Sequence, residues 1–225
     1  MMGLPTSFVV GAGALLLAAS SQAPTAVVED VTGRTAGVQF MDYVDPDQVI
    51  KLGPQDSITI GYLKSCVRET ITGGTVIVGQ DQSDVRGGNV VRSRVDCDGG
   101  KMLLTAQLAA QSGAAVVRDL KNGPQLPQPQ FTIYGLSPII EAKEGDTVVL
   151  DRLDMPGERH NIFIGGRRLL HGGFIDLARA NIMLAAGGLY RAKDGDRELV
   201  FRVDRGADSG ATPIVGRLLR FPPTS

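Results

Sequence analysis

The sequence contains no tryptophan, and aromatic residues make up only 5% of its 225 positions. Proteins that stack sugars or nucleic-acid bases use exposed aromatic rings, so this composition argues against such a binding platform. Lysine and arginine number 23, and aspartate and glutamate 24, which gives a formal net charge of −1. Because there is no basic excess to contact a phosphate backbone, the sequence predicts no nucleic-acid partner.

Long apolar runs are also missing, because none reaches the roughly 20 residues of a membrane-spanning helix. The run at residues 8–19, FVVGAGALLLAA, has the length of a signal-peptide hydrophobic region and is followed by small residues. It predicts a signal peptide over residues 1–23 and a periplasmic or extracellular protein without a membrane span after cleavage. The alternative is that this run forms a buried strand or helix.

A proline-rich segment, DLKNGPQLPQPQ at residues 119–130, divides the chain. Proline at this density is typical of an extended connector. It separates a first domain at 24–118 from a second at 131–222. Short β-branched runs between glycine-containing turns occur in both, which predicts a mostly β fold of two small domains. Only residues 101–111, KMLLTAQLAAQ, leave helix and strand equally open.

Period-two alternation marks the strands expected in the first domain. Over residues 89–98 it places Val91, Val95 and Cys97 on one buried face. Residues 57–62 and 75–79 are two further strands. The charged side chains near the first cysteine, Lys64, Arg68 and Glu69, are expected on a solvated face, and the glycine pairs at 73–74, 87–88 and 99–100 in turns.

There are two cysteines, Cys66 and Cys97. An even count in an exported chain indicates a disulfide, and both residues fall on inward positions of the alternating pattern. Free buried thiols and a reactive or metal-bound thiol are the alternatives. The first domain has no histidine to complete a zinc site, and the chain has no C-x-x-C motif. A bridge closing about 30 residues contributes roughly 3–4 kcal/mol of stability.

The segment LAAGGLY in the second domain has the spacing L-x-x-G-x-x-Y. It resembles the tyrosine corner of fibronectin type III and immunoglobulin-like sandwiches, with Leu184, Gly187 and Tyr190 in the motif positions. The resemblance implies that Gly187 makes a turn, that the Tyr190 hydroxyl bonds to nearby backbone, and that the domain is an immunoglobulin-like antiparallel sandwich. The alternative is a helix from Ile175 that ends at Ala186. Seven strands are expected, at 131–140, 147–153, 161–165, 182–184, 189–192, 198–203 and 214–221.

The first domain, with GYLKSCVRETITGGTVIVG and a later DCDGGK, resembles a group of secreted proteobacterial proteins. Its short strands and glycine turns are also similar to FecR-like periplasmic β domains. Neither resemblance implies a catalytic residue. The FecR-like similarity implies a periplasmic sensor or regulatory module as one function.

The two histidines, His160 and His171, are the other candidate site residues, with Asp176 as a third ligand of a metal-dependent enzyme or binder. Their spacing matches no metal motif, so turn or surface histidines are the competing interpretation. The segment HGG at 171–173 occurs in esterase oxyanion holes, but no G-x-S-x-G nucleophile motif accompanies it. No motif indicates a cofactor. The sequence therefore predicts a non-catalytic exported protein that binds another envelope or extracellular protein.

Overall fold

The computed structural model describes residues 23–33, 37–103, 126–165, 169–211 and 213–221. Nearly every element in them is a β-strand, and most strand pairs are antiparallel, which confirms the mostly β class. The predicted signal peptide lies outside the described residues except for residue 23, and so does the predicted linker over 119–125. Residues 101–103 form a helical turn, and the rest of 101–111 is also outside. No helix in the described segments is long and apolar enough to cross a membrane.

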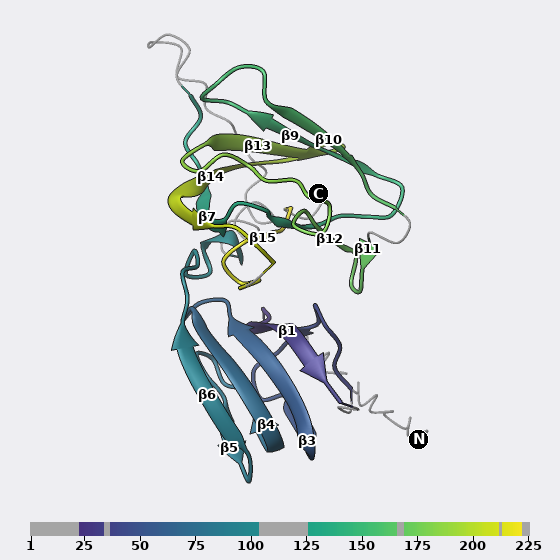
Figure 1. Cartoon of the computed structure of the whole chain (residues 1–225), viewed down its shortest axis with the longest axis vertical. Coiled ribbons are helices and arrows are strands. Elements are labelled where there is room, and N and C mark those ends of the chain that lie inside the picture. Colours follow the sequence, from purple (N-terminus) through teal and green to yellow (C-terminus); the bar gives the residue numbers. More distant parts are fainter. Residues whose placement is uncertain (1–22, 34–36, 104–125, 166–168, 212, 222–225) are drawn as a thin grey trace, which may run out of the picture.

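Residues 26–94 form the first sheet, which is the lower body in Figure 1. Its strand order is β2-β1-β3-β4-β5, and β6 also pairs with β4. Side chains with β-branched or aromatic groups, such as Ile58, Ile60 and Tyr62, are buried along β3 and favour this conformation. The strands are β1 (Ala26–Thr32), β2 (Tyr43–Val44), β3 (Val49–Tyr62), β4 (Val67–Ile77), β5 (Asp84–Arg86) and β6 (Asn89–Arg94).

Two sheets make up the second half, which is the upper body in Figure 1. One has the order β10-β9-β13-β14-β7, and the other β11-β12-β8-β15. Buried residues of both sheets, including Leu150, Phe201 and Ile140, belong to one hydrophobic cluster, so the sheets pack on a common core. The strands are β7 (Phe131–Gly135), β8 (Ile139–Glu141), β9 (Thr147–Arg152), β10 (Arg159–Phe163), β11 (Leu169–Leu170), β12 (Phe174–Asp176), β13 (Leu189–Asp194), β14 (Arg197–Asp208) and β15 (Leu218–Leu219).

Two strand pairs of the second half are parallel, β14 with β7 and β15 with β8. The expected strand at 182–184 does not form, although the Leu184 N–H donates to the Leu136 carbonyl at 2.8 Å. The alternative helix from Ile175 does not form either, because β12 ends at Asp176 and a series of turns follows. Strands β11 and β12 were not expected.

The two halves share a hydrophobic core. A separate cluster lies within the first sheet and includes Ile58, Ile60 and Tyr62. The core of the second half, however, also contains Val27, Met41, Leu63 and Met102 from the first. Buried apolar surface across this boundary favours one joint orientation of the halves, because separating them would expose it to water.

Two details of the first sheet correct the sequence analysis. In β6, Val91 is 64% exposed, whereas Val90 packs on the first core, so the predicted inward face of residues 89–94 was wrong by one residue. The Gly73–Gly74 pair lies inside β4, where the pairing with β3 shifts register between Leu52 and Ser57. It therefore forms an irregularity within the strand and not a turn. The positive φ of both residues, 66° and 82°, explains why glycine stands there.

Candidate functional site

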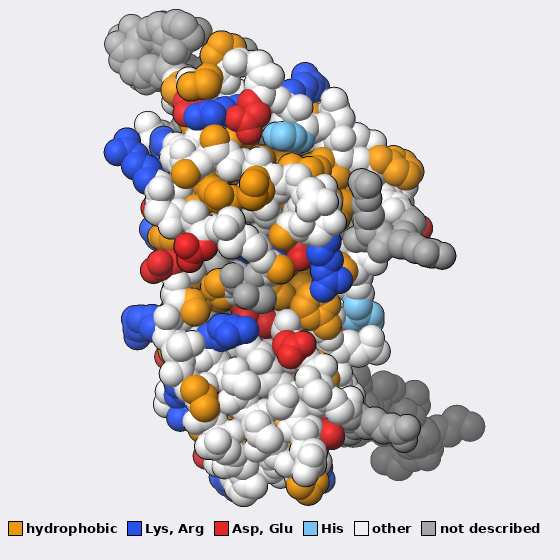
Figure 2. All heavy atoms as spheres, viewed as in Figure 1, with side chains coloured by type: hydrophobic (Ala, Val, Ile, Leu, Met, Phe, Trp, Pro, Cys, Tyr) orange, Lys and Arg blue, Asp and Glu red, His pale blue; other side chains and the backbone are white. Residues whose placement is uncertain are grey.

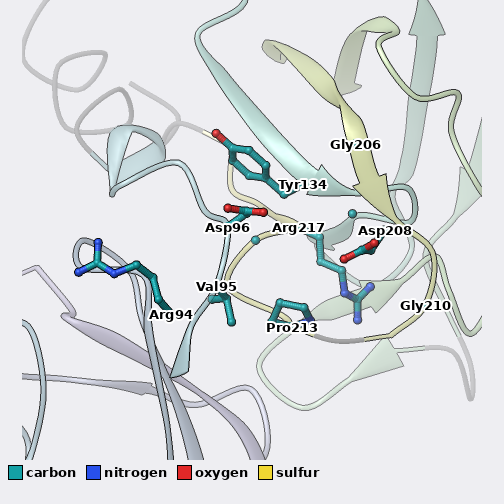
Figure 3. A pocket seen from close by; sticks show the side chains of 11 residues that line it. Arg94, Val95, Asp96, Tyr134, Gly206, Asp208, Gly210, Pro213 and Arg217 are labelled. Atoms are coloured by element: carbon teal, nitrogen blue, oxygen red, sulfur yellow. The ribbon is translucent and has the colours of Figure 1, made fainter. Parts of the chain in front are cut away.

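The candidate site is a cleft of about 280 Å³ where the two halves meet, called here the junction cleft. The first half contributes the last residue of β6 and the segment that follows it, and the second half contributes β7, β14 and the loop before β15. Figure 3 shows these walls facing each other. The lining residues are Arg94, Val95, Asp96, Tyr134, Gly135, Gly206, Asp208, Gly210, Pro213, Gly216 and Arg217.

The first wall is held by the predicted disulfide, which the structure confirms. Cys66 and Cys97 are bonded, with their Cα atoms 5.6 Å apart. Beside the bridge, the Val95 N–H donates to the Cys66 carbonyl at 2.9 Å. Because Asp96 lies between Val95 and Cys97, both constraints fix its position in the cleft wall.

The sequence analysis expected Cys66 to continue the alternation of β3, and in the structure it does not. It lies in the turn between β3 and β4, with a φ of 57°, and is half-buried. Its N–H donates to the Tyr62 carbonyl at 3.1 Å, which closes that turn. The disulfide therefore joins a turn to the segment after β6 and not two inward-facing strand positions.

Gly216 brings the two walls of the cleft into contact. A Cβ atom at this position would lie 2.4 Å from the carbonyl oxygen of Asp96. That separation is shorter than any van der Waals contact, so only glycine lets the two backbones approach this closely. The Gly216 carbonyl also accepts a hydrogen bond of 2.7 Å from the Tyr134 N–H, which ties β7 to the same point.

Arg217 is buried beneath the cleft and is 1% exposed. Its Nη1 donates at 2.7 Å to both the Ser137 carbonyl and the Asp176 carboxylate, and its Nη2 contacts Asp176 at 3.2 Å and the Ala211 carbonyl. The Nε–H has no hydrogen-bond partner among the described residues. This Nε atom is itself buried, so the unsatisfied donor is enclosed by the protein and is not open to the cleft.

Glu29 of β1 connects the two halves through buried contacts. Its side chain has no exposed surface and lies 2.7 Å from the Arg68 Nε, and it also accepts a hydrogen bond of 2.9 Å from the Val215 N–H. Gly61 leaves room for this link, because a Cβ there would lie 2.6 Å from the Glu29 Oε1 atom. One carboxylate thus orders the loop that carries Gly216 and Arg217.

A second buried carboxylate, Glu69, corrects the expectation of a solvated side chain. It is 0% exposed and lies 2.6 Å from the Arg92 Nε. It also accepts a hydrogen bond of 3.1 Å from the Ser83 N–H. Arg68, another of the three charged neighbours of Cys66, is half-buried against Glu29, so Lys64 is the one that is exposed.

The cleft carries more unpaired negative than positive charge. Asp96 and Asp208 are exposed and form no ion pair within the described part of the chain. Arg217 is neutralised by Asp176. The pKa of Tyr134 is raised, first by burial and then by the nearby carboxylates of Asp204, Asp96 and Asp98. The smaller part of this rise in pKa comes from the negative charges of those carboxylates.

The side chains that line the cleft carry carboxylates, a phenol and guanidinium groups. Among the described lining residues, none is a serine, cysteine or histidine that could form a nucleophile–base pair. The pKa of Tyr134 moves away from neutrality, which is opposite to the change that a general base requires. The cleft offers exposed carboxylates and walls fixed by covalent and hydrogen-bonded constraints.

The structure gives His160, His171 and Asp176 separate partners. The His160 Nε2 lies 3.4 Å from Glu158, the His171 Nε2 lies 2.9 Å from Asp42, and Asp176 is paired with Arg217. Across the described ranges, no group of three histidine, cysteine or acidic side chains is arranged to hold a metal. These residues are therefore not brought together as one site.

The Leu184–Gly187–Tyr190 segment leads into β13, the middle strand of the five-stranded sheet. Leu184 is buried, Gly187 has a φ of 77°, and the Tyr190 hydroxyl accepts a hydrogen bond of 2.8 Å from the Ala185 N–H. The hydroxyl also donates to Glu158 at 2.6 Å. Its burial and this carboxylate raise the pKa of Tyr190.

Comparison of the chain with protein-family models, curated proteins and solved structures found no match.

Proposed function

We propose that this chain is a non-catalytic, exported binding protein of the cell envelope that recognises another envelope or extracellular protein through the junction cleft. The observation that carries the proposal is that both halves build the cleft, and buried groups hold its walls in place. Sites at the boundary between two structural units are common places for ligand binding. Fixed walls favour affinity, because less conformational freedom is lost on binding.

The disulfide supports export. Bridges of this kind persist in the periplasm and outside the cell, and are rare in the cytosol. It agrees with the signal peptide predicted from residues 1–23 and with the resemblance to secreted and FecR-like periplasmic proteins. These features together support the proposal of a periplasmic or extracellular location.

We further propose that the second half is an immunoglobulin-like sandwich. Two sheets on one core and the hydroxyl contact of Tyr190 support this assignment. Sandwiches of this type bind partners through loops at their ends and through sheet edges. The loop before β15, which carries Gly210 and Pro213, is such a loop and lines the cleft.

Site-specific photo-cross-linking in intact cells tests the binding function. A photoreactive residue replaces Ser209, which is exposed beside the cleft, and in a matched control it replaces Asp84 in β5, at the far end of the first sheet in Figure 1. We expect a discrete cross-linked partner from position 209 and none from position 84. Equal capture at both positions, or none at position 209, would contradict the proposal.

A further inference from the structure

The outer edge of β6, called here the β6 edge, has no strand beside it within the described part of the chain. Strand β6 pairs with β4 on its other side. The Val95 N–H donates to the Cys66 carbonyl, which continues the register of β6 with β4. Because antiparallel pairs alternate between bonded and non-bonded, the N–H and C=O groups of Val90, Arg92 and Arg94 point away from β4. No backbone group of the described residues bonds to them, so they can accept a further strand.

The side chains of β6 differ between its two faces. On the core face, Val90 packs against the first hydrophobic cluster, and Arg92 lies 2.6 Å from the buried Glu69. Arg94 follows on this face, because side chains two positions apart share a face of a strand. On the outer face, Val91 is 64% exposed. The β6 edge therefore presents two arginines on one face and an uncovered apolar side chain on the other.

Arg92 is held in position by its neighbours. Its Nε donates to Glu69, and its Nη2 donates to the Ser83 carbonyl at 2.8 Å. Its Nη1 has no partner among the described residues, and 39% of the side chain is exposed. A carboxylate placed opposite Arg92 on an added strand would therefore meet a guanidinium that is already oriented. Little conformational freedom is lost in such a contact, which favours affinity.

The charge of the β6 edge selects the strand that can pair with it. Glu69 neutralises Arg92, whereas Arg94 forms no ion pair in the described ranges. Figure 3 shows the Arg94 guanidinium directed away from the junction cleft, and Figure 2 shows basic side chains on the side of the first sheet where Figure 1 places β6. A second copy of β6 would bring arginines opposite or diagonal to arginines, and like charges across a strand pair are unfavourable. An acidic segment has no such conflict.

We propose that the β6 edge binds an extended acidic segment of the partner protein as an additional antiparallel strand. Two Asp or Glu residues of that segment, with one residue between them, lie opposite Arg94 and Arg92, and an apolar residue follows opposite Val91. Backbone hydrogen bonds supply affinity and the side chains specificity. This inference rests on the proposed function, because Arg94 also lines the junction cleft and so leads the bound segment to it.

Hydrogen exchange of the purified full chain, followed by NMR, tests the added strand. In the free chain, the amides of Val90, Arg92 and Arg94 should exchange fast and those of Val91 and Ser93 slowly, because only the latter two bond to β4. The probe is the peptide acetyl-Thr-Glu-Thr-Glu-Val-Val-amide. At ten times its Kd it should slow exchange at positions 90, 92 and 94 about tenfold, because these amides then exchange only from the free chain.

Three related peptides separate the backbone from the charge. N-methylation of both glutamates removes the N–H groups that would face β6, and it should weaken binding about tenfold or more because two hydrogen bonds are lost. N-methylation of the third and fifth residues is the matched control, since those N–H groups would point away, and this peptide should bind like the original. Lysine in place of both glutamates should weaken binding about tenfold or more, because it removes the charged hydrogen bonds to the arginines.

A variant assigns the charge to the β6 edge. Arg94→Gln should weaken binding of the glutamate peptide about threefold and reduce its salt dependence. Arg159→Gln is the control, because this arginine is 61% exposed in β10, an edge strand of the other half, and its loss should leave binding unchanged. Both variants should keep the amide spectrum of the folded chain, since both side chains are exposed.

The exchange and binding data can overturn the inference. Equal binding of the two N-methylated peptides refutes strand addition. Equal binding of the glutamate and lysine peptides, or unchanged exchange at positions 90, 92 and 94 with the glutamate peptide, refutes an acidic segment as the occupant. Slow exchange at these positions without peptide, rising with the concentration of the chain, would show a second copy there and also refutes it.

The photo-cross-linking experiment separates this inference from the proposed function. If position 209 captures a partner in cells and the glutamate peptide does not bind, only the inference fails. If position 209 captures none while the peptide binds, the β6 edge stands as a binding site and the proposed function fails. Position 84 remains the control, because β5 pairs with β4 beyond Gly74 and lies outside the stretch that the added strand covers.

Discussion

The Glu29 carboxylate accepts a hydrogen bond of 2.9 Å from the backbone N–H of Val215, 186 residues further along the chain. The same carboxylate pairs with Arg68, so a group with no exposed side-chain surface joins the first sheet to the loop that builds the cleft. A charge in this position is favourable only while all its partners are present.

We expect Glu29→Ala to lower the free energy of unfolding by about 3–5 kcal/mol, because it leaves the half-buried Arg68 guanidinium and the buried Val215 N–H without an acceptor. Urea denaturation followed by circular dichroism measures the change. Asp30→Ala, at the exposed neighbouring position, should have an effect near zero. A similar loss in both variants would show that the carboxylate does not hold the halves together.

Removing the disulfide by Cys66→Ala with Cys97→Ala should lower the free energy of unfolding by roughly 3–4 kcal/mol, because the unfolded chain regains the freedom of a loop of about 30 residues. Reducing agent should destabilise the original chain by a similar amount and leave the variant unchanged. Intact-mass measurement without reductant should detect no alkylatable thiol. Two alkylated cysteines in the exported protein would contradict the bridge.

Gly216→Ala should destabilise the protein by about 1–3 kcal/mol, since the added Cβ would lie 2.4 Å from the Asp96 carbonyl and would force the cleft walls apart. Gly206→Ala is the matched control, because that position in the same cleft has its nearest neighbour, the Asp204 Oδ1 atom, at 3.4 Å. Its effect should stay within about 0.5 kcal/mol. Thermal unfolding measures the loss of stability in each variant. Equal losses in Gly216→Ala and Gly206→Ala would argue against the close contact between Gly216 and Asp96.

The hydrogen bonds around Tyr190 predict that the folded protein loses stability in acid. Burial alone would raise the pKa of Glu158, but hydrogen bonds from Tyr190, Arg152 and His160 lower it below its ordinary 4.5. The hydrogen bond from Arg152 also lowers the pKa of Asp154 below its ordinary 3.8. The folded state therefore binds fewer protons than the unfolded state, and this stability is present above the ordinary pKa values and lost as pH falls through the folded ones.

Replacing both acids by Glu158→Gln and Asp154→Asn should thus flatten the fall of stability between about pH 5 and pH 2. Urea midpoints measured across that range give the comparison. Asp84→Asn is the control, since this exposed carboxylate lies in the other half of the molecule. If the urea midpoints of the original chain and of the double variant fall in parallel with pH, Glu158 and Asp154 do not contribute to the acid sensitivity.

The strand class and the disulfide could be predicted because they depend on local signals. Alternating β-branched residues favour strands at 57–62 and 147–153 whatever they pack against. The alternation did not locate the core in residues 89–94, where Val90 and not Val91 packs inward. Two adjacent valines fit either face, and only the pairing of β6 with β4 decides between them.

The cleft could not be predicted, because its parts come from distant segments. Glu29 in AVVEDV and Arg217 in IVGRLLRF are charged residues inside apolar runs, which is the one sequence signal that they carry. Such a residue is buried with a partner or exposed at an edge, and the sequence does not name the partner. Pairing Glu29 with Arg68 and Val215 requires the arrangement of both halves.

The loop before β15 also sets the order in which the protein can mature. Glu29 is synthesised long before Val215, so during translation its carboxylate has no access to this hydrogen-bond donor until the end of the chain is made. Early chain segments usually fold first, and contacts this distant in sequence form late. The junction cleft would then be the last part to form, and a chain interrupted before residue 213 would carry a first half closed by its disulfide but without the loop that completes the cleft.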